Sequence, residues 1–346
     1  MRQRLFFIIS GEHATLPHAE IRAILEAYGI SYRERSASAK LLRLEANVSA
    51  LDAVAQRSMM YDRCGPEILV TPPREQDLVE TVRDADMTQH MTNVRSYAVR
   101  SLRIGGALKA IRREQLERKI GHALQSKGQQ LVVNLTNPDA TFLCVISSKL
   151  LLLGRVTHTR VHGSIASRRP RKRPVFHPST MQPKLARCMV NLSRPIKGSL
   201  LMDPFCGVGG VILEGAAIGC IVIGSDTDAR MLRGARSNLR HYGADYLGMI
   251  VGDATRIPFR SVQSIVTDPP YGREASTRGR TLHSLLQEFI PAAYGVLAKQ
   301  GFMCLCCPTD LQISSIIANT GFDVVETHHL HVHRSLTRRI TVLKKQ

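Results

Sequence analysis

The sequence has 346 residues, of which 44% are hydrophobic and 22% charged, proportions that belong to a folded globular protein and exclude wholesale disorder. Lys and Arg number 47 against 28 Asp and Glu, and the net charge of +19 favours a polyanionic partner, above all nucleic acid. The sequence has no run of about 18 apolar residues, and the apolar stretch at 5–9 is too short for a signal peptide, so we expect a cytoplasmic protein that does not enter a membrane.

The first 157 residues alternate between strand-like and helix-like stretches. Residues 1–65 predict a small α+β unit, in which an amphipathic helix at 16–28 follows a buried strand. Residues 66–157 add a helix–strand–helix–strand–strand order that is typical of many nucleic-acid-binding modules. The helix at 112–127 is basic, and we expect five of its side chains to contact nucleic-acid phosphates: Arg112, Arg113, Arg118, Lys119 and Lys127.

Residues 158–177 differ in composition from both flanks. They hold six Lys or Arg, no acidic residue and no hydrophobic periodicity, which indicates a linker. A basic linker is well placed to contact phosphates, and its candidate residues are Arg168, Arg169, Arg171, Lys172 and Arg173. The alternative is a solvated charge run or a localisation-type patch.

From residue 178 onward, strands and helices alternate regularly. Buried strands are predicted near 199–205, 220–226, 248–254, 264–270 and 301–308, with helices between them, and two further strands follow near 324–332 and 338–343. Strands separated by helices predict an α/β fold with a doubly wound, mostly parallel sheet.

Acidic residues and glycines follow three of these strands. Asp203, Gly207 and Gly209 lie in DPFCGVGG, where glycines at a strand–helix junction let the backbone approach a ligand closely. Asp226 ends the next strand, where an acid accepts hydrogen bonds from ribose hydroxyls. Asp253 follows the third strand and either accepts from an adenine amino group or caps a turn. The set predicts an adenosine-containing ligand, with NAD and S-adenosylmethionine both open.

The motif DPPYG at 268–272 decides the class of reaction. The Asp268 carboxylate and the neighbouring Pro269 carbonyl can both accept hydrogen bonds from one amino group, and Tyr271 offers a flat face for a base. An exocyclic amine is a poor nucleophile because its lone pair is delocalised into the ring. Two acceptors localise that lone pair and aim it at a methyl donor, an arrangement for which a dehydrogenase has no use.

With these motifs, the sequence resembles the class I S-adenosylmethionine-dependent methyltransferases, and more closely the archaeal tRNA guanine-10 N2-methyltransferase family. The resemblance is strongest over 174–275, in VFHPSTMQPKLARCMVNL, DPFCGVGG, GSDTD, GDATRIPF and VTDPPYG. It implies a Rossmann-like methyltransferase domain at 178–346, a ferredoxin-like unit at 1–65, a THUMP-like RNA-binding module at 66–157 and a basic linker at 158–177. It also implies a tRNA partner.

The same resemblance implies a role for each motif residue. Asp203, Gly207 and Gly209 would line the methionine end of S-adenosylmethionine, Asp226 would hold the ribose and Asp253 the adenine. Asp268, Pro269 and Tyr271 would hold the guanine, whose N2 receives one or two methyl groups. One departure is Val208, where the family usually has Thr, and the missing hydroxyl removes a hydrogen bond worth about 0.5–1.5 kcal/mol.

Two alternatives stay open. One keeps the chemistry but changes the acceptor to guanine N2 of rRNA or to adenine N6, and the other is a non-catalytic RNA-binding protein with a degenerate methyltransferase fold. The alternating histidines at 328–333 indicate a solvated or RNA-facing strand rather than a metal site, so we expect no metal. We expect a monomer, and the sequence leaves open whether a small activator protein takes part.

Overall fold

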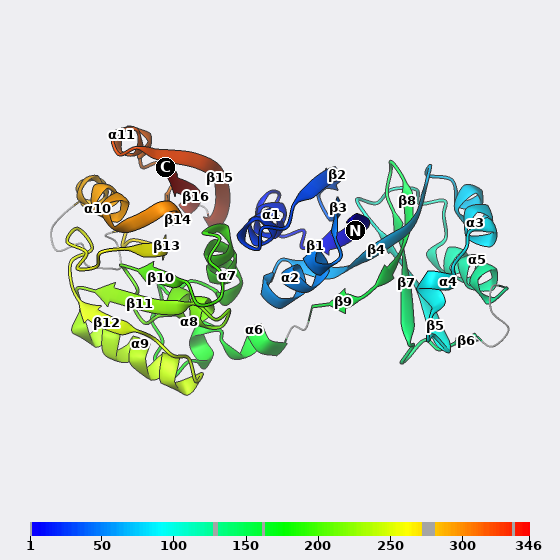
Figure 1. Cartoon of the computed structure of the whole chain (residues 1–346), viewed down its shortest axis with the longest axis horizontal. Helices are drawn as coiled ribbons and strands as arrows, with labels where there is room; N and C mark the ends of the chain where they lie inside the picture. Colours follow the sequence, from blue (N-terminus) through cyan, green and yellow to red (C-terminus); the bar gives the residue numbers. More distant parts are fainter. Residues whose placement is uncertain (1, 127–130, 161–162, 272–280, 334–335) are drawn as a thin grey trace. The chain divides into compact units, whose positions relative to one another are not determined.

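The computed structural model describes residues 2–126, 131–160, 163–271, 281–333 and 336–346, and Figure 1 shows their helices and strands. The chain forms two compact units that interleave along the sequence. Unit 1 comprises Met1–Ala14, Ile30–Ala55 and Tyr61–Arg160, and unit 2 comprises Thr15–Gly29, Gln56–Met60 and Val161–Gln346. The domain boundaries expected at 65, 157 and 177 stay predictions.

Unit 1 is an α+β unit built on one nine-stranded sheet, with the order β2-β3-β1-β4-β8-β7-β5-β6 and β9 beside β4. Its elements are β1 (Arg2–Ile9), β2 (Tyr32–Ser38), β3 (Leu41–Asn47), α2 (Ser49–Arg57, whose end belongs to unit 2), β4 (Tyr61–Thr71), α3 (Glu75–Asp84), α4 (Thr88–Met91), β5 (Ser96–Arg103), α5 (Arg113–Gln125), β6 (Val132–Val133), β7 (Ala140–Ile146), β8 (Leu151–Val156) and β9 (His158–Thr159).

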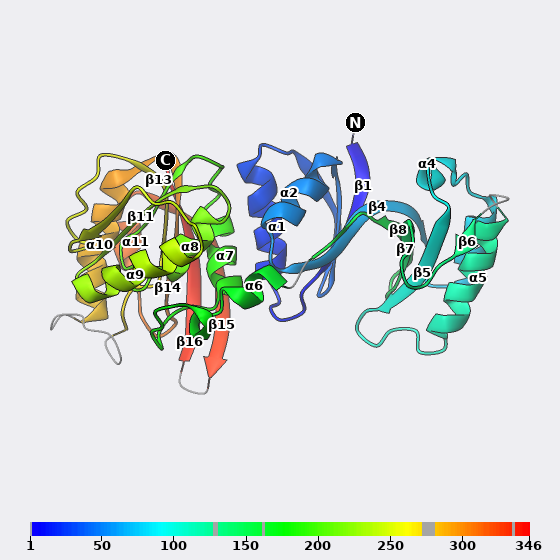
Figure 2. The same ribbon diagram turned by 90° about the horizontal axis from the view of Figure 1, so that it is seen from below.

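The long strand β4 joins the two halves of this sheet, because it pairs with β1 through its first half and with β8 through its second. Helices α3 and α5 lie on one side of β5, β7 and β8 (Figure 1), and Figure 2 shows α5 beside β5 from another direction. The apolar face that they share includes the fully buried residues Leu78, Leu116 and Ile120. The opposite face of α5 is left to its charged residues, as expected for an amphipathic helix on a sheet.

Unit 2 is the predicted doubly wound α/β fold, with a seven-stranded sheet in the order β12-β11-β10-β13-β14-β16-β15. Its elements are α1 (Leu16–Ala27), α6 (Gly163–Ser167), a 3-10 turn (Pro170–Lys172), α7 (Pro183–Leu192), β10 (Leu200–Asp203), α8 (Gly210–Ala216), β11 (Ile221–Asp226), α9 (Ala229–His241), β12 (Gly248–Val251), β13 (Val262–Thr267), α10 (Leu282–Val296), β14 (Leu297–Pro308), α11 (Ser314–Ala318), β15 (Phe322–His333) and β16 (Leu336–Lys345).

Both faces of this sheet are buried, which explains why its strands are almost continuously apolar. Alternate residues belong to two cores: Leu201 and Cys306 face the side of α7, α8 and α9, whereas Met202 and Leu305 face the side of α10 and α11. No helix in the described part of the chain combines the length and the apolar character that crossing a membrane requires.

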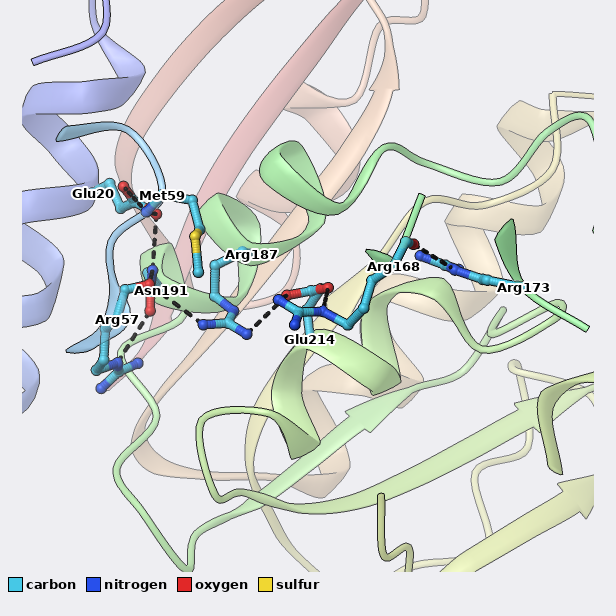
Figure 3. A network of polar contacts seen from close by, with 8 residues as sticks. All are labelled: Glu20, Arg57, Met59, Arg168, Arg173, Arg187, Asn191 and Glu214. Atoms are coloured by element: carbon cyan, nitrogen blue, oxygen red, sulfur yellow. Dashed lines mark hydrogen bonds and ion pairs between the residues drawn. The ribbon is translucent and has the colours of Figure 1, made fainter. Parts of the chain in front are cut away.

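Helix α1 is a component of unit 2, although it comes early in the sequence. Its Leu16, Ala19 and Ala23 share an apolar core with α7. Buried Glu20 accepts a hydrogen bond from Asn191 Nδ2 at 2.8 Å (Figure 3). It accepts another from the Ser58 hydroxyl at 2.5 Å. A carboxyl group with no exposed surface needs such donors, so α1 is held to α7 by specific polar contacts as well as by apolar packing.

Candidate active site

Four functional loops meet at one edge of the unit 2 sheet. Strands β12, β11, β10 and β13 pair in parallel, and their arrowheads point the same way in Figure 1. Asp226, Asp203 and Asp268 stand at or just after the carboxyl ends of β11, β10 and β13, and Asp253 follows β12. The chain runs outward from β10 to β11 and β12 and then returns to β13 on the other side, which is the switch point where α/β sheets bind ligands.

The loop after β10 exposes its backbone at the sheet edge. Gly207 and Gly209 have φ angles of +51° and +82°, which side-chain-bearing residues rarely adopt. No described atom lies within 4 Å of a Cβ built on Gly207, whereas a Cβ on Gly209 would lie 3.2 Å from Cβ of Ala235 in α9. Gly207 therefore leaves open space for a ligand, and Gly209 permits close packing of α9.

Asp226 fastens the end of β11 to this glycine loop. Its Oδ2 accepts from the Gly207 N–H at 2.9 Å, and its Oδ1 accepts from the Asp228 N–H at 2.9 Å. Each carboxylate oxygen can accept a second hydrogen bond, so the pair of oxygens can also receive ribose hydroxyls. Burial removes water from the Asp226 carboxylate and so raises its pKa, which favours the uncharged form. Hydrogen bonds donated by a ligand would replace those of the water and favour the ionised form again.

Asp203 is the deepest carboxyl of the site, with 2% of its surface exposed. Its Oδ1 accepts from the Thr267 hydroxyl at 2.7 Å and from the Phe205 N–H at 3.1 Å, which ties the ends of β10 and β13 together. Burial raises the pKa of Asp203 to about 7, and the nearby carboxylates of Asp226 and Asp268 add to this effect. A cationic ligand over the loop would favour the ionised form, so the site fits a positively charged molecule.

Asp253 caps a turn, and Val208 packs between the glycine loop and α9. Asp253 Oδ1 accepts from both the N–H and the hydroxyl of Thr255 at 2.9 Å, so this residue does cap a turn, at the edge where an adenine would lie. Val208 is 5% exposed, and its carbonyl accepts from Asn238 Nδ2 at 2.9 Å. The valine is thus part of the packing between the glycine loop and α9.

The Asp268–Tyr271 turn is partly buried beside the start of β16. The Tyr271 hydroxyl donates to Oδ1 of Asp268 and lies 3.5 Å from Sγ of Cys306. Nη1 of Arg338 lies 3.4 Å from Oδ2 of Asp268. Burial raises the pKa of Asp268, while the guanidinium of Arg338 and the Tyr271 hydroxyl lower it. The contact between Arg338 and Asp268 was not predicted from the sequence, because Arg338 lies 70 residues beyond Asp268 on a separate strand.

Of the predicted phosphate-binding residues in unit 1, the described ones are exposed: Arg112, Arg113, Arg118 and Lys119. Lys127 lies outside the described residues. Lys119 forms an ion pair with Glu75 at 2.7 Å, and Arg113 donates to the Ser101 carbonyl at 2.9 Å. Arg112 and Arg118 are therefore the better candidates for phosphate contacts on α5.

The basic segment 168–173 divides into exposed and inward-facing residues. Arg169, Arg171 and Lys172 are exposed. Arg168 instead pairs with buried Glu214 at 2.8 Å, and Arg173 is 5% exposed and donates to the Arg168 carbonyl (Figure 3). The expectation that Arg168 and Arg173 contact phosphates stays a prediction. The Arg168 guanidinium is paired with Glu214, and Nη1 and Nη2 of Arg173 are buried without a hydrogen-bond partner among the described residues.

The histidines of β15 have different surroundings. His328 is buried, and its ring nitrogens contact Thr15 at 2.8 Å and Glu326 at 3.2 Å, whereas His329 and His331 are exposed. Across the ranges that the structure describes, no group of three or more His, Cys, Asp or Glu could hold a metal ion.

Comparison with known proteins places this site among methyltransferases. Residues 170–340 match the family UPF0020, described as an RMKL-like methyltransferase domain. The chain is 34% identical over 342 residues to the tRNA (guanine(10)-N2)-dimethyltransferase of Methanothermobacter thermautotrophicus, covering 99% of each chain. It is 29% identical over 367 residues to the protein of the same name from Methanocaldococcus jannaschii, covering 98% of this chain and 99% of that one. TrmN from Thermus thermophilus shares the fold, with a TM-score of 0.54 and 20% identity over 99% of this chain and 100% of its own.

Proposed function

The chain belongs to the archaeal tRNA (guanine(10)-N2)-dimethyltransferase family, and we propose that it transfers methyl groups from S-adenosylmethionine to N2 of guanosine 10 in tRNA. The observation that supports this most directly is the position of the Asp268–Tyr271 turn. It lies at the carboxyl end of β13, next to the glycine loop after β10, so an amine held by the turn would face a methyl donor held by the loop.

The residues of the glycine loop and the neighbouring strand ends suit S-adenosylmethionine. Asp203 and the open backbone at Gly207 would lie at its methionine end, Asp226 would accept from its ribose hydroxyls and Asp253 stands at the edge where its adenine would lie. When bound, S-adenosylmethionine supplies an electrophilic methyl group on a positively charged sulfur. The ionisable pair Asp203 and Asp226 would offset that charge.

The chemistry of the turn is acceptance of hydrogen bonds from an aromatic amine. The Asp268 carboxylate and the Pro269 carbonyl would each accept from one N–H of guanine N2, which localises the nitrogen lone pair and aims it at the methyl group. Tyr271 would stack on the guanine. As the new N–C bond forms and the S–C bond breaks, the nitrogen becomes cationic and releases one proton, for which Asp268 is the adjacent acceptor.

Unit 1 and the basic segment 168–173 would together supply the affinity for tRNA. A guanosine inside a folded tRNA must leave its stack to enter the site, at a cost of a few kcal/mol that contacts elsewhere must offset. Exposed Arg112 and Arg118 on α5, in the part proposed as a THUMP-like module (66–157), and the exposed cations Arg169, Arg171 and Lys172 are the candidates. We further propose that the protein acts as a monomer in the cytoplasm.

The test is methyl transfer by the purified chain alone, without an activator protein. Labelled S-adenosylmethionine should modify a tRNA transcript, and digestion with mass analysis should identify N2-methylguanosine or N2,N2-dimethylguanosine. A tRNA carrying inosine at position 10 lacks the N2 amine and should receive no label. Asp268→Ala should lower turnover about 100-fold or more while leaving cofactor affinity nearly unchanged, and the exposed Asp245→Ala should match the wild type.

Labelling of the inosine tRNA to the same extent, or of rRNA in preference to tRNA, would assign the activity to a different acceptor. Full turnover in Asp268→Ala would refute the role given to this carboxylate.

A further inference from the structure

Arg338 of β16 contacts both functional side chains of the Asp268–Tyr271 turn. Its Nη1 lies 3.4 Å from Oδ2 of Asp268, and its guanidinium carbon lies 5.5 Å from the centre of the Tyr271 ring. The side chains of Arg338 and Asp268 are each 16% exposed, so solvent and salt screen this ion pair only weakly. A cation that touches the acceptor carboxylate and the stacking ring at once is suited to position both.

The sheet register explains how a residue from the last strand reaches the site. β14 runs parallel to β13, with Thr267 opposite Leu305, and antiparallel to β16, with Pro308 opposite Arg338. Because β16 runs in the opposite direction, its beginning lies at the edge where β13 and β14 end. Arg338 therefore approaches Asp268 from a rigid sheet and not from a loop.

The Asp268 carboxylate has contacts with Tyr271, Arg338 and the Cys306 thiol, and it has room for one further donor. The Tyr271 hydroxyl donates to Oδ1 and Arg338 faces Oδ2, so the two contacts fix the plane of the carboxylate. A carboxylate has about four lone-pair positions, so one is left for an amine. Nε of Arg338 is buried and has no hydrogen-bond partner among the described residues. Leaving such a donor unsatisfied costs free energy, so fold stability alone does not account for this arginine.

We propose that Arg338 is a positioning residue for methyl transfer: it holds the Asp268 carboxylate charged and turned towards the acceptor amine, and it holds the Tyr271 ring in the stacking position. The inference rests on the proposed function, because the acceptor amine is what Asp268 would receive.

A pH dependence follows from the groups around Asp268. These are Tyr271 on its own turn, Asp203 on β10, Cys306 and Cys307 on β14, and Arg338 on β16. Burial raises the pKa of Asp268 and Arg338 lowers it. Removal of the guanidinium must therefore raise the pKa of Asp268, so the carboxylate becomes ionised only at higher pH. The acid limb of the pH profile of turnover should shift upward.

The experiment measures single-turnover methyl transfer to tRNA as a function of pH. In Arg338→Gln we expect turnover to fall about tenfold or more near neutral pH, with the acid limb displaced upward by about 1 pH unit or more, the usual effect of losing an adjacent opposite charge. Arg338→Lys should keep the limb near its wild-type position and recover only part of the turnover, because an ammonium group cannot reproduce the planar contact with Tyr271.

Arg339→Gln is the matched control. Arg339 is the next residue on β16, and its guanidinium donates to the Leu311 carbonyl on the other face of the sheet. Its loss should leave the acid limb unchanged. As a second control, adding Arg338→Gln to Asp268→Asn should cause a smaller fall in turnover than Arg338→Gln causes in the wild type, because only the contact with the Tyr271 ring is then left for Arg338 to act through.

A wild-type acid limb in Arg338→Gln, or an equal fall on the Asp268→Asn background, would overturn the inference. If the wild-type protein transfers no methyl group to tRNA, the proposed function is wrong. In that case, titration of the ¹³C-labelled Asp carboxyl groups, followed by NMR without tRNA, tests whether Arg338 lowers the pKa of Asp268. The Asp268 signal, assigned by its absence in Asp268→Asn, must titrate at higher pH in Arg338→Gln than in the wild type, and equal titration overturns the inference.

Discussion

Replacing Asp203 by asparagine should stabilise the protein while weakening its cofactor site. Burial raises the pKa of this carboxyl from 3.8 to about 7. Between these two pH values the native carboxyl keeps a proton that the unfolded chain has released. The contribution of Asp203 to the free energy of unfolding is therefore most favourable below about pH 4 and is lost as the pH rises towards 7. At about 1.4 kcal/mol per pKa unit, ionisation of the native carboxyl costs about 4 kcal/mol.

Asparagine avoids this cost and keeps the local hydrogen bonds. The Thr267 hydroxyl and the Phe205 N–H both donate to Oδ1 of Asp203, and the amide oxygen of asparagine can accept both. The variant should exceed the wild type in unfolding free energy by about 1.5 kcal/mol at pH 5 and about 4 kcal/mol at pH 8. For a unit of roughly 200 residues, the larger figure corresponds to a rise in Tm of about 8–16 °C.

Scanning calorimetry of the two proteins at several pH values between these limits is the assay, with the exposed Asp245→Asn as the control that should follow the wild type. The affinity for S-adenosylhomocysteine, measured by titration calorimetry, should fall in Asp203→Asn. A stability difference that does not change with pH, or a variant less stable than the wild type at pH 8, would refute the reasoning about this carboxyl.

Three further predictions concern other parts of the chain. Asp226→Ala should weaken cofactor binding by about 1.5–3 kcal/mol, roughly 10- to 150-fold in Kd by titration calorimetry, because two ribose hydroxyls lose a charged acceptor; an unchanged Kd would remove the ribose from this strand end. Glu214→Gln should lower the unfolding free energy by about 3–5 kcal/mol in urea titrations, because Arg187, 2% exposed and 2.8 Å from Glu214, is left without its counter-charge; a wild-type midpoint would contradict this. The double variant Arg112→Gln/Arg118→Gln should lower the log–log salt slope of tRNA binding by about 1.4–1.8, and an unchanged slope would place the phosphate contacts elsewhere.

The sequence predicts those parts of the site that follow a strand directly. Asp203, Asp226 and Asp268 could be placed at one sheet edge because strand–helix alternation implies parallel strands, whose carboxyl ends meet. For Asp253 the sequence left two alternatives, an adenine contact and a turn cap; the structure shows the turn cap, and the adenine contact stays a prediction. These positions depend on local pattern and on one topological rule.

Contacts between distant segments could not be predicted in this way. Arg338 reaches Asp268 only because β16 inserts beside β14 in antiparallel register, and the pattern of a strand does not state which neighbour it pairs with. The charge run at 168–173 indicated solvent-exposed cations, yet Arg168 is drawn inward by Glu214 on α8. An ion pair with a buried acid depends on the tertiary position of that acid, which composition does not reveal.

The interleaved path of the chain also sets an order of events during synthesis. Helix α1 belongs to unit 2, but Glu20 and its partner Asn191 are 171 residues apart. At about 5–20 residues per second, a ribosome needs roughly 10–30 s to deliver α7 after α1 has emerged. During that interval Leu16, Ala19 and Ala23 have no α7 to cover them. The nascent chain thus exposes an apolar helix face that chaperones can bind. In a chain truncated before α7, this face keeps no packing partner and can be recognised by protein quality control.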